Sequence, residues 1–256
     1  MTKGAGPEPG RGSQGEGASH ASQARERIAR RVAREFRSGE LVNLGIGLPT
    51  QVAMFLPPDG SVRVHAENGI VGMGPAAAPG EEDPDLIDAG GRYVTVLPGA
   101  AFLDSVTSFA LARSGKVHAC VLGAFQVGAN GDLANWRVPG RAAPGVGGAM
   151  ELAQKVPRVI VASLHRDRDG DPKLLDRCTL PLTARGTVTR IVTELAVLEP
   201  ADGAFRLLEV APDATVDEVR AVTGAPLIED EAGPWNAYAV ADAAAPAPPA
   251  TKGADA

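Results

Sequence analysis

One carboxylate stands where a strand-like segment ends and a glycine turn begins. Glu67 follows the predicted strand at 62–66, and Asn68-Gly69 turns the chain directly after it. A carboxylate in this position, beside a glycine that lets a ligand approach the backbone, can act as a nucleophile or as a general base. The simpler interpretation is that Glu67 caps a turn and faces water. This one residue does not decide between the two.

Two glycine-rich segments have the form of anion-binding loops. Residues 145–150 (GVGGAM) lead into a helical pattern, and backbone N–H groups at a helix start can bind an anion or an oxyanion. A flexible connector is the alternative. Residues 43–49 (NLGIGLP) have the same strand–glycine–helix form, but they lack the third glycine and the acidic residue of a dinucleotide fingerprint. The pair Asn135-Trp136 is a weaker binding candidate, because an isolated Trp more often serves packing.

The elements that must position these residues alternate between strand and helix. Apolar, β-branched runs predict strands, and helical spacing of apolar residues predicts helices. The predicted strands are 41–44, 62–66, 93–97, 117–122, 158–164, 187–198 and 204–210, and the predicted helices are 22–37, a helix from Pro49, 101–113, 148–155 and 216–222. This alternation predicts an α/β fold with an open, largely parallel sheet flanked by helices. Chemistry collects at the carboxyl ends of such strands, where Glu67 and the glycine segments lie.

Composition outlines one domain and excludes several classes of function. Residues 1–20 and 241–256 are rich in Gly, Ser, Pro and Ala, so we predict two disordered tails around a domain at 21–240. The net charge of −6 favours neither nucleic acid nor an anionic membrane as a partner. The arginines at 25, 27, 30, 31 and 34 are predicted to form the solvated face of a helix. The scattered histidines and two cysteines predict no metal site and no disulfide framework.

No apolar run is long enough to span a bilayer, and the N-terminus lacks the layout of a secretory signal. A cytoplasmic location is therefore expected.

Eight short motifs follow one another in an order typical of one enzyme family. They are VNLGIGLP at 42–49, ENG and GMGP within 67–75, LPGA at 97–100, LANW at 133–136, GGAM at 147–150, CTLPLT at 178–183 and TELAV at 193–197. Over about residues 24–225 the chain resembles the beta subunit of family I CoA-transferases of the bacterial 3-oxoacid type. It also resembles the C-terminal half of the single-chain succinyl-CoA:3-oxoacid enzyme. The resemblance implies the CoA-transferase fold, which is similar to that of sugar isomerases.

The resemblance implies covalent catalysis by Glu67. In this family the matching glutamate attacks an acyl-CoA thioester to form a mixed anhydride, and the released thiolate converts the anhydride into a glutamyl-CoA thioester. The acceptor acid then reverses the sequence, so CoA is part of a substrate and no cofactor is bound permanently. The N–H of Gly148 is expected to bind the oxyanion. The expected contacts to substrate or CoA are Asn43, Gly45, Gly47, Asn68, Gly69 and Gly147.

The resemblance also implies a partner. The chain lacks the alpha half, so we expect an alpha subunit in an α2β2 assembly, with succinyl-CoA and acetoacetate as the acyl donor and the acid. A 3-oxoadipate or acetate CoA-transferase is the alternative, and a non-catalytic ligand-binding module on the same fold is another. Two departures from the family pattern, Ala66 after His65 and a less basic segment at 141–144, are expected to shift acyl preference.

Overall fold

The computed structural model describes residues 13–141, 145–229 and 232–235, with side chains from residue 20 onward. Residues 1–12 and 241–256 of the two predicted tails lie outside the described residues, whereas residues 13–20, predicted as part of the first tail, begin a helix. The elements, in chain order, are α1 (Ser13–Ala33), β1 (Leu41–Leu44), the 3₁₀ helix η1 (Pro49–Phe55), β2 (Arg63–Ala66), β3 (Ile70–Ala76), β4 (Val94–Phe102), α2 (Ser105–Arg113), β5 (Ala119–Leu122), β6 (Gln126–Gly128), β7 (Leu133–Ala134), α3 (Ala149–Lys155), β8 (Val159–Ala162), β9 (Leu174–Leu175), β10 (Val188–Val192), β11 (Ala196–Ala201), β12 (Ala204–Val210), α4 (Val216–Ala221), β13 (Leu227–Ile228) and β14 (Gly233–Pro234).

One large sheet organises the fold and confirms the predicted class. Its strands follow the order β13-β12-β11-β10-β8-β5-β1-β2-β3-β4, and β14 pairs with β12. The central strands β2, β1, β5, β8 and β10 are mutually parallel. Antiparallel hairpins extend the sheet on both sides, through β3 and β4 and through β11 and β12. The carboxyl ends of the central strands therefore meet along one edge, where ligands bind in sheets of this kind.

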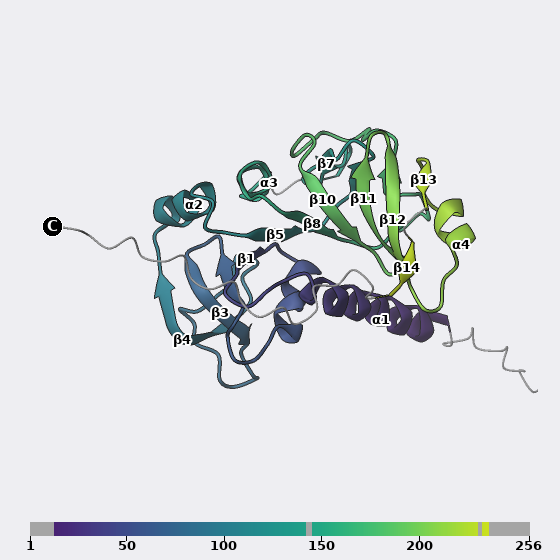
Figure 1. The fold of residues 1–256 in the computed structure, drawn as a ribbon. Helices are drawn as coiled ribbons and strands as arrows, with labels where there is room; N and C mark the ends of the chain where they lie inside the picture. Colours follow the sequence, from purple (N-terminus) through teal and green to yellow (C-terminus); the bar gives the residue numbers. More distant parts are fainter. Residues whose placement is uncertain (1–12, 142–144, 230–231, 236–256) are drawn as a thin grey trace, which may run out of the picture.

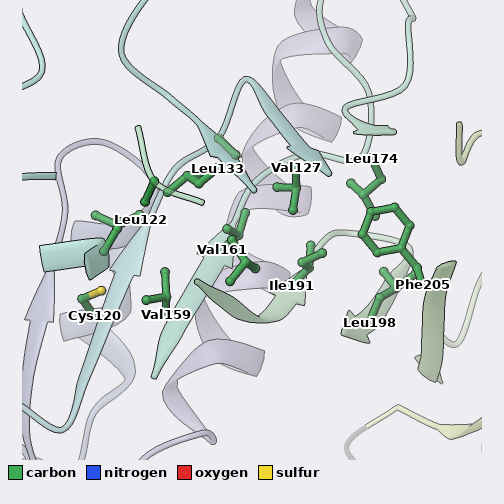
Figure 2. Close-up of a cluster of buried hydrophobic side chains, with 14 of the residues drawn as sticks. Cys120, Leu122, Val127, Leu133, Val159, Val161, Leu174, Ile191, Leu198 and Phe205 are labelled. Carbon is green, nitrogen blue, oxygen red and sulfur yellow. The ribbon is translucent and has the colours of Figure 1, made fainter. Parts of the chain in front are cut away.

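Helices cover both faces of this sheet, so its central strands are buried on both sides. In β5 all four residues are buried, and alternate side chains enter opposite cores, as the two-residue period of a strand requires. Cys120 and Leu122 belong to the core that α3 covers, shown in Figure 2, whereas Ala119 and Val121 belong to the core that α1 covers. Figure 1 shows α1 on the side of the sheet opposite α2 and α3.

Several predicted boundaries were wrong: the helix predicted at 22–37 runs over Ser13–Ala33, and the strand predicted at 93–97 extends to Phe102. The glycine-rich stretch at 70–76, which none of the predicted strands included, forms β3 and pairs antiparallel with β2. The run 187–198 holds two strands, β10 and β11, because the Thr193 hydroxyl accepts hydrogen bonds from the N–H groups of Leu195 and Ala196 and turns the chain. The predicted helix at 101–113 begins only at Ser105, after β4 has ended.

Arg31 was wrongly placed on a solvated helix face. Its side chain is fully buried and donates to Glu209 of β12 through Nε and Nη2, at 2.7 and 2.8 Å, and to Glu35 through Nη1 at 2.7 Å. A buried guanidinium is tolerated only when its charge and its donors are matched in this way. The partner lies 178 residues away on the sheet, so the local sequence does not reveal it.

In the part of the chain that the structure describes, no helix is long and apolar enough to cross a bilayer. Within the same residues, no cluster of three His, Cys, Asp or Glu side chains is arranged to hold a metal ion.

Candidate active site

The carboxyl ends of β1, β2, β5 and β8 border one open cleft of about 720 Å³. This volume lies in the range that small-molecule sites occupy. Residues from six segments line it: Gly45–Pro49 after β1, Glu67 after β2, Leu122–Phe125 after β5, Asn135 and Trp136 after β7, Gly145–Ala149 at the start of α3, and Ala162–Leu164 at the end of β8. Arg25, Ala89 and Lys173 complete the lining that the structure describes.

Glu67 enters the cleft because a tight turn ends β2 directly behind it. The N–H of Gly69 donates to the carbonyl of Ala66 at 2.9 Å, and the chain then returns as β3. Gly69 has a φ of +121°, and a Cβ there would stand 2.0 Å from the carbonyl oxygen of Leu103. Only glycine meets both conditions, so this turn fixes the direction in which Glu67 leaves the strand.

The Glu67 carboxylate is half-buried against the start of α3. Burial raises the pKa of this carboxyl, and a hydrogen bond from the backbone N–H of Gly148 opposes the rise. The fit is close, because a Cβ on Gly148 would lie 2.5 Å from Glu67 Oε2. A desolvated carboxylate held by a single backbone donor is a better nucleophile than one that water surrounds, because less solvation has to be removed before it attacks.

A buried polar network supports the backbone of Glu67. The side-chain amide of Asn43 on β1 donates to the carbonyl of His65 at 3.0 Å and lies 3.2 Å from His65 Nδ1. On the other side of the ring, His65 Nε2 lies 2.9 Å from Ser108 Oγ, and Ser108 Oγ donates to the Glu67 carbonyl at 2.9 Å. Burial lowers the pKa of His65 to about 4, so the ring is neutral at pH 7. A neutral ring that accepts at Nδ1 donates from Nε2, which makes every link of the network consistent.

The structure brings some of the predicted site residues together and separates others. Gly45, Gly47, Gly147 and Gly148 line the cleft with Glu67. Asn43 is 1% exposed and bonded within the network, so it lies beneath the cleft. Asn68 points outward and donates to the carbonyl of Ile87 at 2.8 Å, and Gly69 is buried in the turn. Asn43, Asn68 and Gly69 thus shape the site in this structure, and they are absent from the lining of the cleft.

Sequence reasoning missed several residues of the site. Ser108 sits within the helical pattern, and Lys173 in a polar stretch, and neither has a motif around it. Asn135 and Trp136, weak candidates by sequence, both line the cleft and are held by hydrogen bonds to the carbonyls of Gly123 and Leu182. For Ser108 and Lys173, the polarity of the side chain was the only feature of the sequence that could have indicated a role in the site.

We expect the stability of the protein to depend on the titration of His65. The unfolded chain binds a proton on this residue near pH 6.5, but the folded chain does so only near pH 4. The neutral ring therefore contributes fully to the free energy of unfolding above pH 6.5. This contribution is lost as the pH falls to 4, and the loss is about 3 kcal/mol. His65→Gln replaces the imidazole with an amide, which can still form hydrogen bonds but does not titrate. Thermal melting between pH 7.5 and 4.5 should show a smaller loss for this variant than for the wild type. Identical slopes would contradict the assignment.

Comparisons with known proteins identify the family of this chain. Residues 25–221 match the family model described as coenzyme A transferase. The chain is 51% identical over 202 residues to the beta chain of the acetate CoA-transferase of Escherichia coli K12, and the match covers 79% of this chain and 92% of that protein. It is 44% identical over 216 residues to the B chain of the 3-oxoadipate CoA-transferase of Acinetobacter baylyi, with 84% and 100% covered. An acyl-CoA transferase apoenzyme from E. coli O157:H7 superposes with a TM-score of 0.65 at 19% identity, over 82% of this chain and 43% of that one, and shows a shared fold.

Proposed function

This chain belongs to the coenzyme A transferase family as a beta subunit, and we propose that it transfers CoA through a covalent intermediate on Glu67. The observation that carries the proposal is the half-buried Glu67 carboxylate beneath the Gly148 N–H, at the wall of a cleft that can hold a thioester. The non-catalytic alternative gives this buried carboxylate no role.

The proposed reaction has four balanced steps. Glu67 attacks the acyl carbonyl of an acyl-CoA, which forms an acyl–glutamyl anhydride and expels the CoA thiolate. The thiolate attacks the glutamyl carbonyl, which releases the first acid as its carboxylate and leaves a glutamyl-CoA thioester. The acceptor carboxylate attacks that thioester, which forms a second anhydride and expels the thiolate again. The thiolate finally attacks the acyl carbonyl of the acceptor, which yields the new acyl-CoA and restores Glu67.

The position of Gly148 supports the steps at the glutamyl carbonyl. Its N–H already donates to the Glu67 carboxylate, and the same group becomes a carbonyl in the anhydride and in the thioester. When the thiolate or the acceptor attacks this carbonyl, negative charge develops on an oxygen next to the donor. A donor fixed before the charge forms stabilises the transition state without reorganisation.

We also propose an alpha subunit as the obligatory partner, in an α2β2 complex. Relatives that this chain matches over more than 90% of their own length are named as beta or B subunits, which implies a separate alpha chain. The acids in the names of these relatives, acetate and 3-oxoadipate, are the first substrates to test, together with succinyl-CoA and acetoacetate.

Co-expression tests the two-subunit proposal. We expect a hetero-oligomer by size-exclusion chromatography with light scattering when the alpha subunit is present. Transfer of CoA between succinyl-CoA and acetoacetate, or between other pairs of the panel, is expected from the complex and absent from the isolated chain. Robust transfer by the isolated beta chain would disprove the obligatory partner, and a complex without transfer on any acid would disprove the function.

A further inference from the structure

The chain from 103 to 109, which leads into α2, holds the Glu67 turn at two points. The N–H of Leu103 donates to the carbonyl of Gly69 at 2.8 Å, and Ser108 Oγ donates to the carbonyl of Glu67 at 2.9 Å. Both acceptors are backbone groups of the turn that ends β2, and they stand at its two ends. The direction in which Glu67 leaves its strand is therefore fixed from α2 as well as by the turn itself.

The next residue of α2 contacts the backbone donor to which Glu67 is bonded. A Cβ on Gly148 would lie 2.9 Å from Phe109 Cζ and 2.5 Å from Glu67 Oε2, so the ring and the carboxylate meet at one face of this glycine. α2 also packs against α3 (Figure 1), and an ion pair of 2.9 Å between Arg113 and Glu151 joins the two helices. One helix therefore contacts both the nucleophile and the donor above it.

The direction of the Ser108 hydroxyl is set by the group behind it. Ser108 is fully buried, and its Oγ lies 2.9 Å from Nε2 of His65. The neutral His65 ring donates from Nε2, because its Nδ1 faces the amide nitrogen of Asn43. The hydroxyl accepts this bond and directs its own proton to the Glu67 carbonyl. A serine in a helix can instead donate to the carbonyl one turn before it, so the bond to Glu67 depends on the tertiary structure.

We propose that Ser108 is a positioning residue for the transfer reaction, and that its hydroxyl holds the backbone of Glu67 where the carboxylate meets the Gly148 N–H. This inference rests on the proposed covalent function. Ser108 is absent from the described lining of the cleft, so it acts through Glu67 and does not touch the substrate. A displacement of about 1 Å at a reacting group can lower the rate on the order of 100-fold, so a single buried hydrogen bond behind the nucleophile can have a large effect on turnover.

The test measures adduct formation and CoA binding separately in the complex with the alpha subunit. The acyl-CoA is one that the wild-type complex turns over. For Ser108→Ala we expect the rate constant for forming the Glu67 thioester, at saturating acyl-CoA without acceptor, to fall about 10- to 100-fold, and kcat to fall with it. The Kd of CoA by isothermal titration should change no more than about two-fold, because Ser108 does not line the cleft.

Ser108→Cys distinguishes the hydrogen bond from simple packing. Cysteine fills the same space but is a weak donor, so its rate should stay near that of Ser108→Ala. A wild-type rate in Ser108→Cys would show that the side chain only fills space and would overturn the inference. An unchanged rate in Ser108→Ala, or a loss of CoA binding as large as the loss of rate, would also overturn it. Thermal midpoints show whether each variant folds, and Ser108→Cys serves as the test variant if Ser108→Ala does not.

Ser114→Ala is the matched control. The Ser114 hydroxyl also donates to a backbone carbonyl, that of Leu111 at 2.7 Å, but it lies at the exposed end of α2 and outside the cleft lining. Its adduct rate and kcat should equal those of the wild type, and a loss equal to that of Ser108→Ala would contradict a specific role for Ser108. A wild-type complex that forms no adduct on Glu67 would instead refute the proposed covalent function.

Discussion

Replacing Glu67 with glutamine should reduce CoA transfer by on the order of 10⁴-fold or more, the scale on which loss of a covalent nucleophile acts. Glutamine has nearly the same shape, and its amide oxygen can still accept from the Gly148 N–H. The half-buried position should therefore remain filled, and the loss should appear in kcat while the protein folds and assembles normally. Because Glu67 carries a buried charge with one backbone donor, the neutral amide is also expected to leave thermal stability unchanged or slightly higher.

Chemical trapping distinguishes a nucleophile from a general base. The complex incubated with acyl-CoA and no acceptor should hold CoA as a thioester on Glu67. Borohydride or hydroxylamine should then inactivate it, but only after acyl-CoA has been added. Mass spectrometry should locate the modification on the peptide that contains Glu67-Asn68-Gly69, and initial-rate kinetics should be ping-pong.

The control is Glu81→Gln, which removes an exposed carboxylate outside the cleft lining and should retain full turnover. Near-normal turnover of Glu67→Gln would refute the covalent mechanism. A general base would instead give no adduct and would require both substrates to be bound at once.

Replacing Gly148 with alanine keeps the backbone N–H but pushes the Glu67 carboxylate away from it, and we expect kcat to fall by about 100- to 1,000-fold, the scale on which an oxyanion contact acts. The added methyl group would lie 2.5 Å from Oε2 of Glu67, 2.8 Å from its Cδ and 2.9 Å from Cζ of Phe109. Real Cβ atoms do not approach other atoms this closely, so both side chains, each of which is partly exposed, must shift, and the Glu67 carboxylate then leaves its present position. Gly148 has a φ of −78° and a ψ of −8°, which alanine adopts readily, so backbone strain does not explain the loss.

Gly123→Ala is the matched control for this variant. Gly123 lines the same cleft and has no positive φ, but a Cβ there meets nothing within 4 Å. Its kcat should change by no more than a few-fold. The kinetics of both variants are measured together with CoA binding and thermal midpoints. A lower kcat at an unchanged thermal midpoint indicates a defect at Glu67, whereas a lower midpoint indicates poor folding. Wild-type kcat in Gly148→Ala would show that the close contact with Glu67 is not needed for turnover.

The sequence by itself determined the fold class and the residue at the centre of the proposed chemistry. Apolar runs predicted β1, β5, β8 and β12 to within two residues at each end. In β5 and β8 the reason is that strands buried on both faces must be apolar throughout. Local features, a strand end and a helix start, made Glu67 and the glycine segment before α3 candidates, and only the resemblance of the motifs to CoA-transferases chose the catalytic interpretation. The same local reasoning failed at β3, because its glycines resemble a loop until the pairing with β2 is known.

Only the tertiary structure decided which distant residues act together. The network from Asn43 through His65 and Ser108 to the Glu67 carbonyl joins β1, β2 and α2. Its partners lie 22, 43 and 41 residues apart in the sequence, so no local pattern brings them together. Lys173 faces the cleft because the segment after β8 folds back over the strand ends, and Arg31 is buried because Glu209 meets it from β12. In each case a polar group is stable only beside a partner far away in the chain. Local sequence encodes the cost of burying such a group, whereas the compensating contact exists only after the sheet has formed.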